Sequence, residues 1–351
     1  MLRGAIIGLG NVAVYGHLPG WLGRHDIEIV AGTDVRPGRR LELQCRVPRA
    51  RWYDTAAELL ARERLDFVDI CTPPATHAGV IRSALGHGLH VLCEKPLVCS
   101  LEDLSALARL VADRHRVLYT VNNWLHAPII QKVRELVRQG AIGEVKRCLW
   151  QTLRMQPAAA ADEQAGNWRL DPAMAGGGIL VDHGWHVFYV LQGWLGHAPL
   201  RIGALLETRR LPKSPLEDTA TMWLEFPAAT AEVFLTWASD VRRNWAELGG
   251  THGTIRVEDG TLVLIQSRSQ RRERRWPCPP PLSEGSHHPD WFGGVANGFV
   301  AEVTDATARG VNLAEASLCV TFLTLAQESS RRGGDSLPVL QPPMAQEWQW
   351  T

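Results

Sequence analysis

A lysine that follows an apolar, strand-like run is the first feature of this sequence with a chemical use. Residues 90–93 read His-Val-Leu-Cys and are followed by Glu94-Lys95-Pro96. This pattern predicts that the Lys95 amine lies at the carboxyl edge of a parallel sheet, where open α/β sheets bind their ligands. A lysine, unlike an arginine, can lose its proton when it is partly desolvated. Lys95 is therefore a candidate for holding or passing a proton, and a surface lysine after a strand is the alternative.

An aspartate and a histidine four residues apart form a second candidate. Asp182 and His186 follow three glycines at 176–178, and a helix entered from that run would place both side chains on one face. An imidazole with a carboxylate neighbour can accept a hydroxyl proton near neutral pH. The alternative is a polar helix face with a capping aspartate.

The first strand and the turn after it predict a dinucleotide site. Residues 2–8 form an apolar strand, Gly8-Leu9-Gly10-Asn11-Val12-Ala13 follows, and a helix is expected over 13–22. In such a GxGxxA turn the first glycine permits the tight bend, and the second lets the backbone approach a pyrophosphate, which then faces the N–H groups of the helix. The expected contacts of this loop are Gly8, Gly10, Asn11 and Val12.

An acid at the end of the second strand indicates which cofactor is bound. The strand over residues 27–33 leads into Asp34, about 20 residues after the glycines, where a carboxylate meets the adenosine ribose diol. Asp34 would repel a 2′-phosphate, which favours NAD. Arg36, Arg39 and Arg40 follow and could neutralise that phosphate, so NADP remains an alternative. A helix-capping acid and a solvated helix face are the other interpretations of these residues.

The rest of the first 122 residues alternates between strands and helices. The expected elements are a helix at 55–62 capped by Asp54, a strand at 66–71, a helix capped by Thr76, the strand before Lys95, a helix at 101–114 and a strand at 117–121. Thr72 and Pro73 break the chain at the cofactor edge, and His77 is assigned a structural role. Strands that alternate with crossover helices in this way predict one doubly wound parallel sheet over residues 1–122.

The regular alternation of strands and helices ends after Asn122-Asn123, which predicts a second domain over residues 123–351. A helix is expected at 128–138, and strands are expected at 145–154, 200–208, 218–226, 230–237 and 254–265. Alternation and turns outnumber helical crossovers here, so we expect an α+β domain with a mostly antiparallel sheet. The strand, glycine turn and strand over 247–255 reads as scaffold. The basic run 268–275 reads as an exposed hairpin end, with a contact to an anionic substrate as the alternative.

Composition excludes several classes of partner. The 351 residues carry a formal net charge of zero, which gives no long-range attraction to nucleic acid or to anionic membranes. The chain runs straight into a strand without a secretory signal, and no apolar run is long enough for a membrane span. Seven cysteines without a CxxC pair favour a reduced, cytoplasmic protein without a metal site. Fourteen tryptophans favour buried aromatic surface in an interface or a sugar pocket.

The order of these motifs resembles the Gfo/Idh/MocA oxidoreductase family over almost the whole chain. The motifs are the GxGxxA turn, Thr72-Pro73-Pro74, Glu94-Lys95-Pro96, the run from Gly176 to His186 and the turn Gly250-Thr251-His252-Gly253-Thr254. The resemblance implies an N-terminal Rossmann domain and a C-terminal open-faced sheet that forms a homo-oligomer, either a dimer or a tetramer. It also implies NAD(P)-dependent redox chemistry at a carbon of a sugar, cyclic polyol or nucleotide sugar.

The resemblance also assigns roles to individual residues. Lys95, Asp182 and His186 fall on the catalytic positions, and Asn123 falls near the nicotinamide. The expected cofactor contacts beyond the glycine loop are Asp34, Arg36, Thr72, Pro73, Glu94, Lys95 and Asn123. Relatives often place arginines after this asparagine, whereas this chain reads Trp124-Leu125-His126. The expected substrate contacts are Trp168, Arg169 and His183.

These residues lead to one mechanism and two rivals. In the leading hypothesis His186 takes the proton of a secondary hydroxyl while its carbon gives hydride to the nicotinamide, and Lys95 stabilises charge on that oxygen. A glycoside-cleaving enzyme would use the same oxidation transiently and return the hydride. A sensor that binds dinucleotide without chemistry is the third hypothesis.

Overall fold

The chain folds into two compact units. The computed structural model describes residues 1–159, 166–210, 215–267 and 271–340. The first unit consists of Met1–Asn123, Ala159–Gly176 and Ser286–Ser317, and the second consists of Trp124–Ala158, Gly177–Gly285 and Leu318–Thr351. Two segments that follow residue 123 therefore pack in the first unit. A single domain boundary between residues 122 and 123 stays a prediction.

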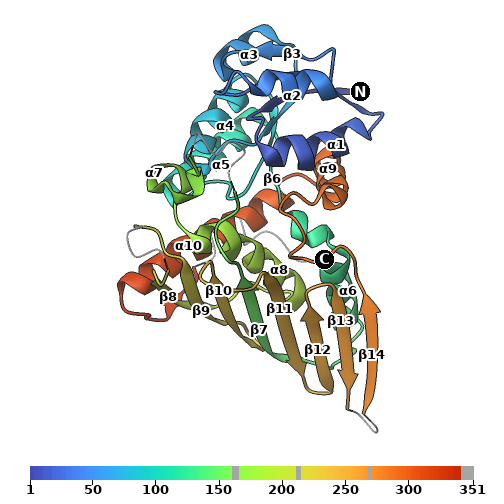
Figure 1. Ribbon diagram of the computed structural model, residues 1–351, viewed down its shortest axis with the longest axis vertical. Coiled ribbons are helices and arrows are strands. Elements are labelled where there is room, and N and C mark those ends of the chain that lie inside the picture. Colours follow the sequence, from blue (N-terminus) through green and yellow to red (C-terminus); the bar gives the residue numbers. More distant parts are fainter. Residues whose placement is uncertain (160–165, 211–214, 268–270, 341–351) are drawn as a thin grey trace. The chain divides into compact units, whose positions relative to one another are not determined.

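The first unit is built on a six-stranded sheet in which every neighbouring pair is parallel (Figure 1). Its strands are β1 (Leu2–Ile7), β2 (Ile27–Thr33), β3 (Arg51–Tyr53), β4 (Phe67–Ile70), β5 (His90–Cys93) and β6 (Leu118–Thr120). Their order is β3-β2-β1-β4-β5-β6, with the first strand in the middle. The strand order reverses beside β1, and ligands of open α/β sheets bind at such a point.

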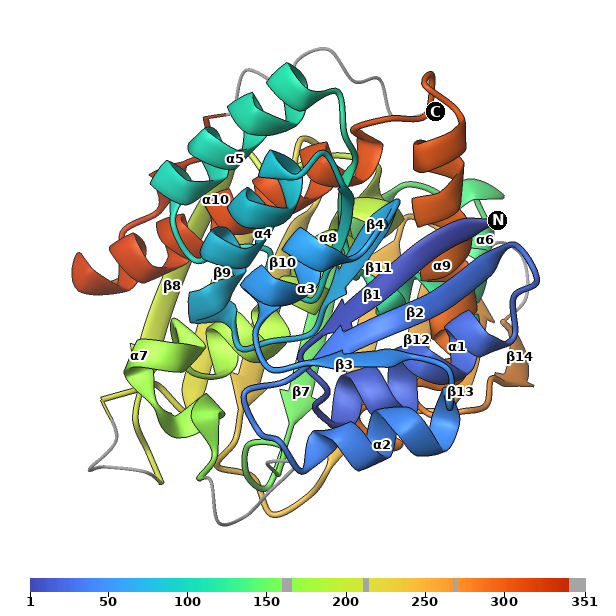
Figure 2. The ribbon, with the colours of Figure 1, turned by 90° about the horizontal axis from the view of Figure 1, so that it is seen from above.

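Helices cover both faces of this sheet (Figure 2). One face carries α3 (Ala56–Arg62), α4 (His77–Gly86) and α5 (Leu101–Arg114). The other carries η1 (Val12–His17), α1 (Leu18–Leu22), α2 (Arg39–Arg46) and α9 (Pro289–Thr304). The unit also holds η2 (Pro74–Thr76), η5 (Trp168–Leu170) and α7 (Pro172–Ala175). The aromatic rings of Trp21, Phe67 and Phe299 lie within 6.3 Å of one another, which anchors α9 to the sheet.

Two predicted helix caps are wrong. Helix α3 is capped by Thr55, whose hydroxyl accepts a hydrogen bond from the backbone of Glu58 at 3.1 Å, and not by Asp54. Thr76 makes no side-chain cap, because its hydroxyl donates to the hydroxyl of Thr72 at 2.7 Å. Thr55 has the extended backbone that an N-cap needs, whereas Thr76 is already helical. The predicted helix at 101–114 is confirmed as α5.

The second unit is built on a nine-stranded sheet that is antiparallel except where β7 pairs with β10. Its strands are β7 (Val145–Leu153), β8 (Arg201–Glu207), β9 (Thr219–Glu225), β10 (Thr230–Thr236), β11 (Arg243–Gly250), β12 (Gly253–Glu258), β13 (Thr261–Gln266), β14 (Arg272–Pro277) and β15 (Leu337–Pro338). Their order is β14-β13-β12-β11-β7-β10-β9-β8-β15. This arrangement, with the parallel sheet of the first unit, confirms the predicted fold class.

One face of the nine-stranded sheet is covered and the other is open. The helices of this part of the chain are α6 (Pro128–Arg138), η6 (Leu180–Gly184), α8 (Trp185–Leu195) and α10 (Val311–Arg331), and η3 (Asn123–His126) precedes them. On the covered face Trp150 of β7 packs between Trp124 and Trp194, with ring centroids 6.0 and 5.5 Å away. The open face carries half-exposed side chains such as Trp223 and Leu205. Because one face is covered and the other is open, buried and exposed residues alternate along these strands, and this alternation predicted the sheet.

Two strand predictions for this unit need correction. The segment 254–265 is not one strand, because it contains the hairpin of β12 and β13. Residues 272–275 of the basic run are exposed at the end of the hairpin of β13 and β14, as expected, but they belong to the edge strand β14 and not to the loop; residues 268–270 lie outside the described residues. Arginines at a sheet edge discourage the pairing of that edge with another chain.

All seven cysteines of the chain are free thiols. Within residues 1–340, apart from the three short gaps, no helix combines the length and the apolar character that a bilayer crossing requires.

Candidate active site

The glycine loop leaves room at the residue where a phosphate would approach. Gly8 has a φ of +92°, and a Cβ there would lie 2.8 Å from the side chain of Thr72, so only glycine fits the turn. Gly10 differs, because no heavy atom outside its immediate neighbours comes within 4 Å of its Cβ position among the described residues. Asn11 and Val12 follow at the start of η1. The loop therefore fits a dinucleotide pyrophosphate.

Asp34 holds the glycine loop in place as well as standing at the expected ribose position. Its Oδ2 accepts a hydrogen bond from the backbone N–H of Leu9 at 2.7 Å, and its Oδ1 accepts one from Nε of Arg36 at 2.9 Å. Burial would raise the pKa of the Asp34 carboxyl, but the hydrogen bonds from Arg36 and Leu9 outweigh burial and lower it. The carboxylate is therefore ionised, and Leu9 and Arg36 hold it at the end of β2.

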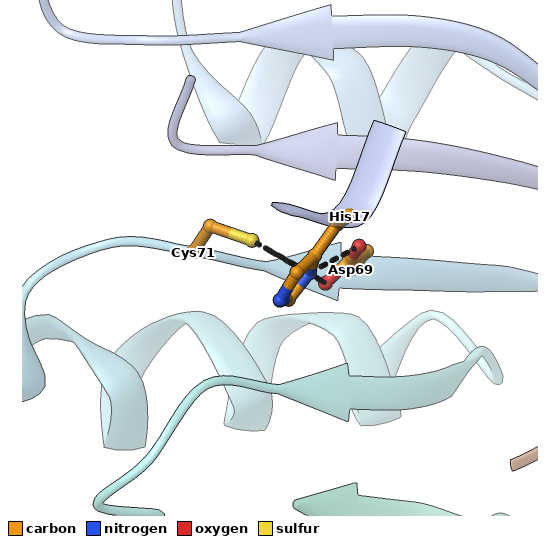
Figure 3. Close-up of side chains that lie close together, drawn as sticks. All are labelled: His17, Asp69 and Cys71. Atoms are coloured by element: carbon orange, nitrogen blue, oxygen red, sulfur yellow. Dashed lines mark hydrogen bonds and ion pairs between the residues drawn. The ribbon is translucent and has the colours of Figure 1, made fainter. Parts of the chain in front are cut away.

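A buried histidine contacts Asp69 of β4 (Figure 3) and also Glu94, the residue directly after β5. His17, the last residue of η1, places Nδ1 2.9 Å from Oδ2 of Asp69 and Nε2 3.0 Å from Oε1 of Glu94. Trp21 donates its indole N–H to the same Asp69 oxygen at 2.7 Å, and Sγ of Cys71 lies 3.3 Å from Nδ1 of His17. Two carboxylates thus share one imidazole.

The charges in this cluster favour an imidazolium. Burial would lower the pKa of His17, but the adjacent Asp69 and Cys71 raise it well above 6.5. Burial would also raise the pKa of Glu94, and the hydrogen bond from His17 outweighs it and lowers that pKa. A protonated imidazole bound to two carboxylates satisfies all three groups.

The same cluster carries metal-ligand atom types, because the ligand atoms of His17, Asp69 and Cys71 lie within 4.8 Å of one another. These atoms already contact one another. Nδ1 of His17 lies 2.9 Å from Oδ2 of Asp69, and Sγ of Cys71 lies 3.4 Å from Oδ1 of the same carboxylate. In this structure the three residues form a hydrogen-bonded network.

Lys95 is presented directly after this network. The backbone N–H of Lys95 donates to Oε2 of Glu94 at 3.0 Å, so the carboxylate that binds His17 also fixes the backbone of Lys95. The peptide bond from Lys95 to Pro96 is cis. His77 is fully buried, and its ring nitrogens lie 2.8 Å from the carbonyls of Pro96 and Thr72, which ties together the loops after β5 and β4. This position agrees with the structural role expected for His77.

All the predicted contacts of the cofactor lie in the first unit. They are Gly8, Gly10, Asn11, Val12, Asp34, Arg36, Thr72, Pro73, Glu94, Lys95 and Asn123. Oδ1 of Asn123 is buried and has no hydrogen-bond partner among the residues that the structure describes. A buried acceptor without a donor is costly, so this atom suits a donor group of a bound ligand.

Close packing explains the glycine run before Asp182. The backbone N–H groups of Gly178 and Leu180 donate to Oε1 of Glu217 at 2.8 and 3.1 Å. A Cβ at Gly178 would lie 1.8 Å from the carbonyl oxygen of Glu217, so no larger residue fits. The turn that follows, η6, is π-helical, and its Asp182 carboxylate lies 3.3 Å from Nδ1 of His183. Glu217 is thus the group that Gly178 approaches, whereas Gly177 approaches the side chain of Val181.

The ring of His186 is held by two aromatic neighbours within the second unit. Nδ1 of His186 lies 2.6 Å from the hydroxyl of Tyr189, and the imidazole stacks on Trp124 with ring centroids 4.5 Å apart. The Tyr189 oxygen also accepts the backbone N–H of Trp124 at 3.1 Å. When Nδ1 donates its proton to Tyr189, the lone pair is on Nε2, which is the state that a general base requires.

The predicted substrate residues fall in different units. Trp168 and Arg169 lie in η5 of the first unit, with the guanidinium 4.3 Å above the indole ring. His183 belongs to the second unit with Asp182 and His186. One face of the Trp168 ring is therefore already covered by Arg169.

Sequence reasoning missed four residues that support these side chains. The missed residues are His17, Asp69, Glu217 and Tyr189. Tyr189 alone carries a local signal, since it lies three residues after His186 on a helix. The other three contact partners that are distant in sequence.

Comparisons with known proteins agree with this architecture. A family model described as "Oxidoreductase family, NAD-binding Rossmann fold" matches residues 2–123, and one described as "GFO/IDH/MocA C-terminal domain" matches residues 130–256. D-apiose dehydrogenase of Rhizobium rhizogenes is 30% identical over 273 residues, which cover 75% of each chain. Myo-inositol 2-dehydrogenase of Thermotoga maritima is 25% identical over 284 residues, 78% of this chain and 81% of that protein.

A solved structure extends the comparison to the fold. An inositol dehydrogenase homologue of Azotobacter vinelandii, crystallised with NAD+, superimposes with a TM-score of 0.79 at 22% identity, and the match covers 96% of this chain and 97% of that one. This likeness shows the same fold, and the family models together with the D-apiose dehydrogenase relative show that the chain belongs to the Gfo/Idh/MocA family of NAD-binding oxidoreductases.

Proposed function

We propose that this protein is an NAD(P)-dependent dehydrogenase that acts on a secondary alcohol or ketone carbon of a sugar or cyclic polyol. Family membership supports the redox chemistry, and two relatives are named as dehydrogenases of D-apiose and myo-inositol. The single observation that carries the catalytic assignment is the fixed imidazole of His186, whose Nδ1 lies 2.6 Å from Tyr189.

In this proposal Lys95, Asp182 and His186 act on one substrate. The cofactor is held by the glycine loop, Asp34 and Asn123, and when bound it supplies a carbon that exchanges hydride with the substrate. Nε2 of His186 takes the proton of the substrate hydroxyl, and Lys95 donates a hydrogen bond to the same oxygen. Asp182 orients the substrate. Oxidation of the alcohol thus releases one hydride and one proton, and reduction reverses both transfers.

The first test measures turnover and cofactor binding separately. A panel of inositols, hexoses, sugar acids and nucleotide sugars is supplied with NAD or NADP, and nicotinamide absorbance is followed. Lys95→Ala and His186→Ala should each lose roughly 10²- to 10⁴-fold in kcat while their affinity for NAD stays near wild type. Lys146→Ala and His197→Ala are the matched controls on exposed side chains. Near-normal turnover in either active-site variant contradicts the proposal.

The same panel separates the dehydrogenase from its rivals. Cleavage of a glycoside without accumulation of NADH would indicate transient oxidation instead. Binding of NAD without turnover of any compound would indicate a sensor.

We also propose that the protein forms a homo-oligomer through the open face of its nine-stranded sheet. Trp223 and Leu205 are 41% and 39% exposed on adjacent strands of that face. Light scattering of the wild type and of Trp223→Asp tests this, and a monomeric wild type contradicts it. A cytoplasmic location is supported by the seven free thiols and is tested by cell fractionation.

A further inference from the structure

Three buried polar side chains gather at one end of the nine-stranded sheet. Arg154 directly follows β7, Trp237 directly follows β10, and Asn244 is the second residue of β11. The backbone N–H of Arg154 donates to the carbonyl of Thr236 at 2.8 Å, and its Nη2 lies 3.3 Å from Oδ1 of Asn244. The ends of three neighbouring strands thus bring these residues side by side.

Each of these side chains has a donor without a partner. Arg154, Trp237 and Asn244 are 3%, 2% and 0% exposed. Among the described residues, no hydrogen-bond acceptor lies within reach of Nε of Arg154, Nε1 of Trp237 or Nδ2 of Asn244. A buried donor that loses water without gaining a partner costs about 1–3 kcal/mol. Three of them in one place therefore indicate a ligand that accepts hydrogen bonds.

The Arg154 charge adds a second requirement. Its Nη1 donates to the carbonyls of Leu153 and Arg243 at 2.8 and 3.2 Å, and no carboxylate of the described residues lies within ion-pair distance of it. Burial and the nearby Arg242 lower the pKa of Arg154 to about 10, against the opposing effect of Asp182 and Asp259. Arg242 itself donates to the carbonyl of Ser283. A buried guanidinium held only by neutral groups favours an anion.

The cluster lies beside the segment that carries Asp182. Strand β10 passes under η6, since a Cβ at Gly184 would lie 3.7 Å from the side chain of Leu235. The electrostatic effect of Asp182 on Arg154 agrees with this neighbourhood. A group bound at the cluster would therefore belong to the molecule on which Asp182 acts.

We propose that Arg154, Trp237 and Asn244 bind a carboxylate of the substrate, so that the sugar or polyol is a sugar acid. This inference rests on the proposed function only in naming the ligand a substrate. A planar carboxylate carries a single negative charge and can accept hydrogen bonds from the guanidinium of Arg154, from Nε1 of Trp237 and from Nδ2 of Asn244. A phosphate would bring a second charge close to Asp182 and Asp259, and a neutral hydroxyl would leave the guanidinium without an anion.

The test compares matched acids and neutral sugars by direct binding. Calorimetry with the full NAD-saturated chain measures D-glucuronate against D-glucose, D-galacturonate against D-galactose, and D-gluconate against D-glucitol, with D-glucose 6-phosphate as the phosphate probe. At least one acid should bind the wild type about tenfold more tightly than its neutral partner and than the phosphate, which is about 1.4 kcal/mol. Arg154→Gln should remove that preference, and Trp237→Phe should weaken it several-fold without removing the ring.

The controls lie on the opposite face of the same strands. Arg147→Gln on β7 and Trp245→Phe on β11 should leave acid binding unchanged. If Arg154→Gln does not fold, the affinities of Trp237→Phe and Trp245→Phe for the acids are compared instead, and only Trp237→Phe should bind them more weakly. Equal binding of every acid and its neutral partner by the wild type overturns the inference, as does tighter binding of the phosphate than of every acid. Equal effects of the test and control variants overturn it as well.

Turnover separates this inference from the proposed function. Oxidation of neutral sugars without a preference for acids would overturn the carboxylate subsite and leave the dehydrogenase intact. Binding of an acid that depends on Arg154, without turnover of any compound, would support the subsite and contradict the dehydrogenase.

Discussion

His17 Nε2 lies 3.0 Å from Oε1 of Glu94, the residue directly before Lys95. The other ring nitrogen of His17 lies 2.9 Å from Asp69, and the ring stacks on Phe292 with centroids 4.2 Å apart. Oε2 of Glu94 accepts the backbone N–H of Lys95. One buried imidazolium therefore connects the helix after the glycine loop to the turn that presents the proposed catalytic lysine.

Removal of the His17 imidazole should destabilise the protein strongly. His17→Ala leaves the carboxylates of Asp69 and Glu94 buried without their shared cation, and breaking a buried ion pair costs about 3–5 kcal/mol. Urea unfolding measures the change, with His25→Ala at an exposed turn as the matched control, expected within about 0.5 kcal/mol of wild type. A loss below about 1 kcal/mol for His17→Ala would mean that the network contributes little.

The His17 contribution should depend on pH. The folded pKa of His17 is raised above 6.5, so its contribution is fully present below 6.5 and is lost as the pH rises through the folded value. The folded pKa of Glu94 is lowered below 4.5, so its contribution is fully present above 4.5 and is lost as the pH falls through the folded value. The stability difference between wild type and His17→Ala should therefore be largest between pH 4.5 and 6.5. Urea unfolding across a pH series checks this, and a difference that grows above pH 6.5 contradicts it.

Tyr189→Phe should impair the proposed base without affecting cofactor binding. The substitution removes the oxygen 2.6 Å from Nδ1 of His186 and keeps the aromatic ring. We expect kcat to fall roughly 10- to 100-fold and its pH profile to shift, because Tyr189 no longer fixes which nitrogen carries the proton. Tyr53→Phe, on strand β3 of the first unit, is the control. An unchanged pH profile would assign Tyr189 a packing role only.

Gly178→Ala should disturb the segment that carries Asp182. The added Cβ would lie 1.8 Å from the backbone oxygen of Glu217, so η6 or its neighbour must move. We expect the free energy of unfolding to fall by about 1–3 kcal/mol, the usual cost of overpacking, with the upper end favoured because the clash is with backbone. Gly193→Ala in α8, where the nearest atom is 3.7 Å away, should instead be neutral or stabilising by up to about 1 kcal/mol. Equal melting temperatures for the two variants would contradict the close approach.

Arg36→Ala should change the choice between the two cofactors. Arg36 donates from Nε to Asp34 at 2.9 Å and is the group beside the ribose position that could neutralise a 2′-phosphate. The ratio of kcat/KM for NAD to that for NADP should therefore rise at least several-fold in the variant. Arg109→Ala, on the exposed face of α5, serves as the control and should leave the ratio unchanged. A fall in the ratio would mean that Arg36 assists NAD through Asp34.

The parts of the fold that could be predicted are those specified by local sequence. Helix α5 begins after Ser100, whose hydroxyl accepts a hydrogen bond from the backbone N–H of Asp103. The helix ends at Arg114, as its sequence pattern indicates. The positions of Gly8, Asp34 and Lys95 at the ends of strands follow in the same way from apolar runs that stop at turn residues.

The parts that could not be predicted depend on contacts between distant segments. Glu217 is 39 residues from Gly178, and His17 is 77 residues from Glu94, so neither partner carries a signal in its own neighbourhood. The apolar face of α9 could cover either sheet, and contacts with distant residues such as Trp21 and Phe67 assign it to the first unit. Arg154 reads from sequence as one more charged residue after a strand.

The most direct test of the central claim is a crystal structure of the protein with NAD and a bound substrate or product. The measured quantities are the distances from Nζ of Lys95 and from Nε2 of His186 to the reacting oxygen. We predict that both lie within about 3.2 Å of the same oxygen, the reach of a hydrogen bond. If either nitrogen lies more than about 6 Å away, beyond the span of one bridging water, the two residues do not act on one alcohol and the proposed mechanism is wrong.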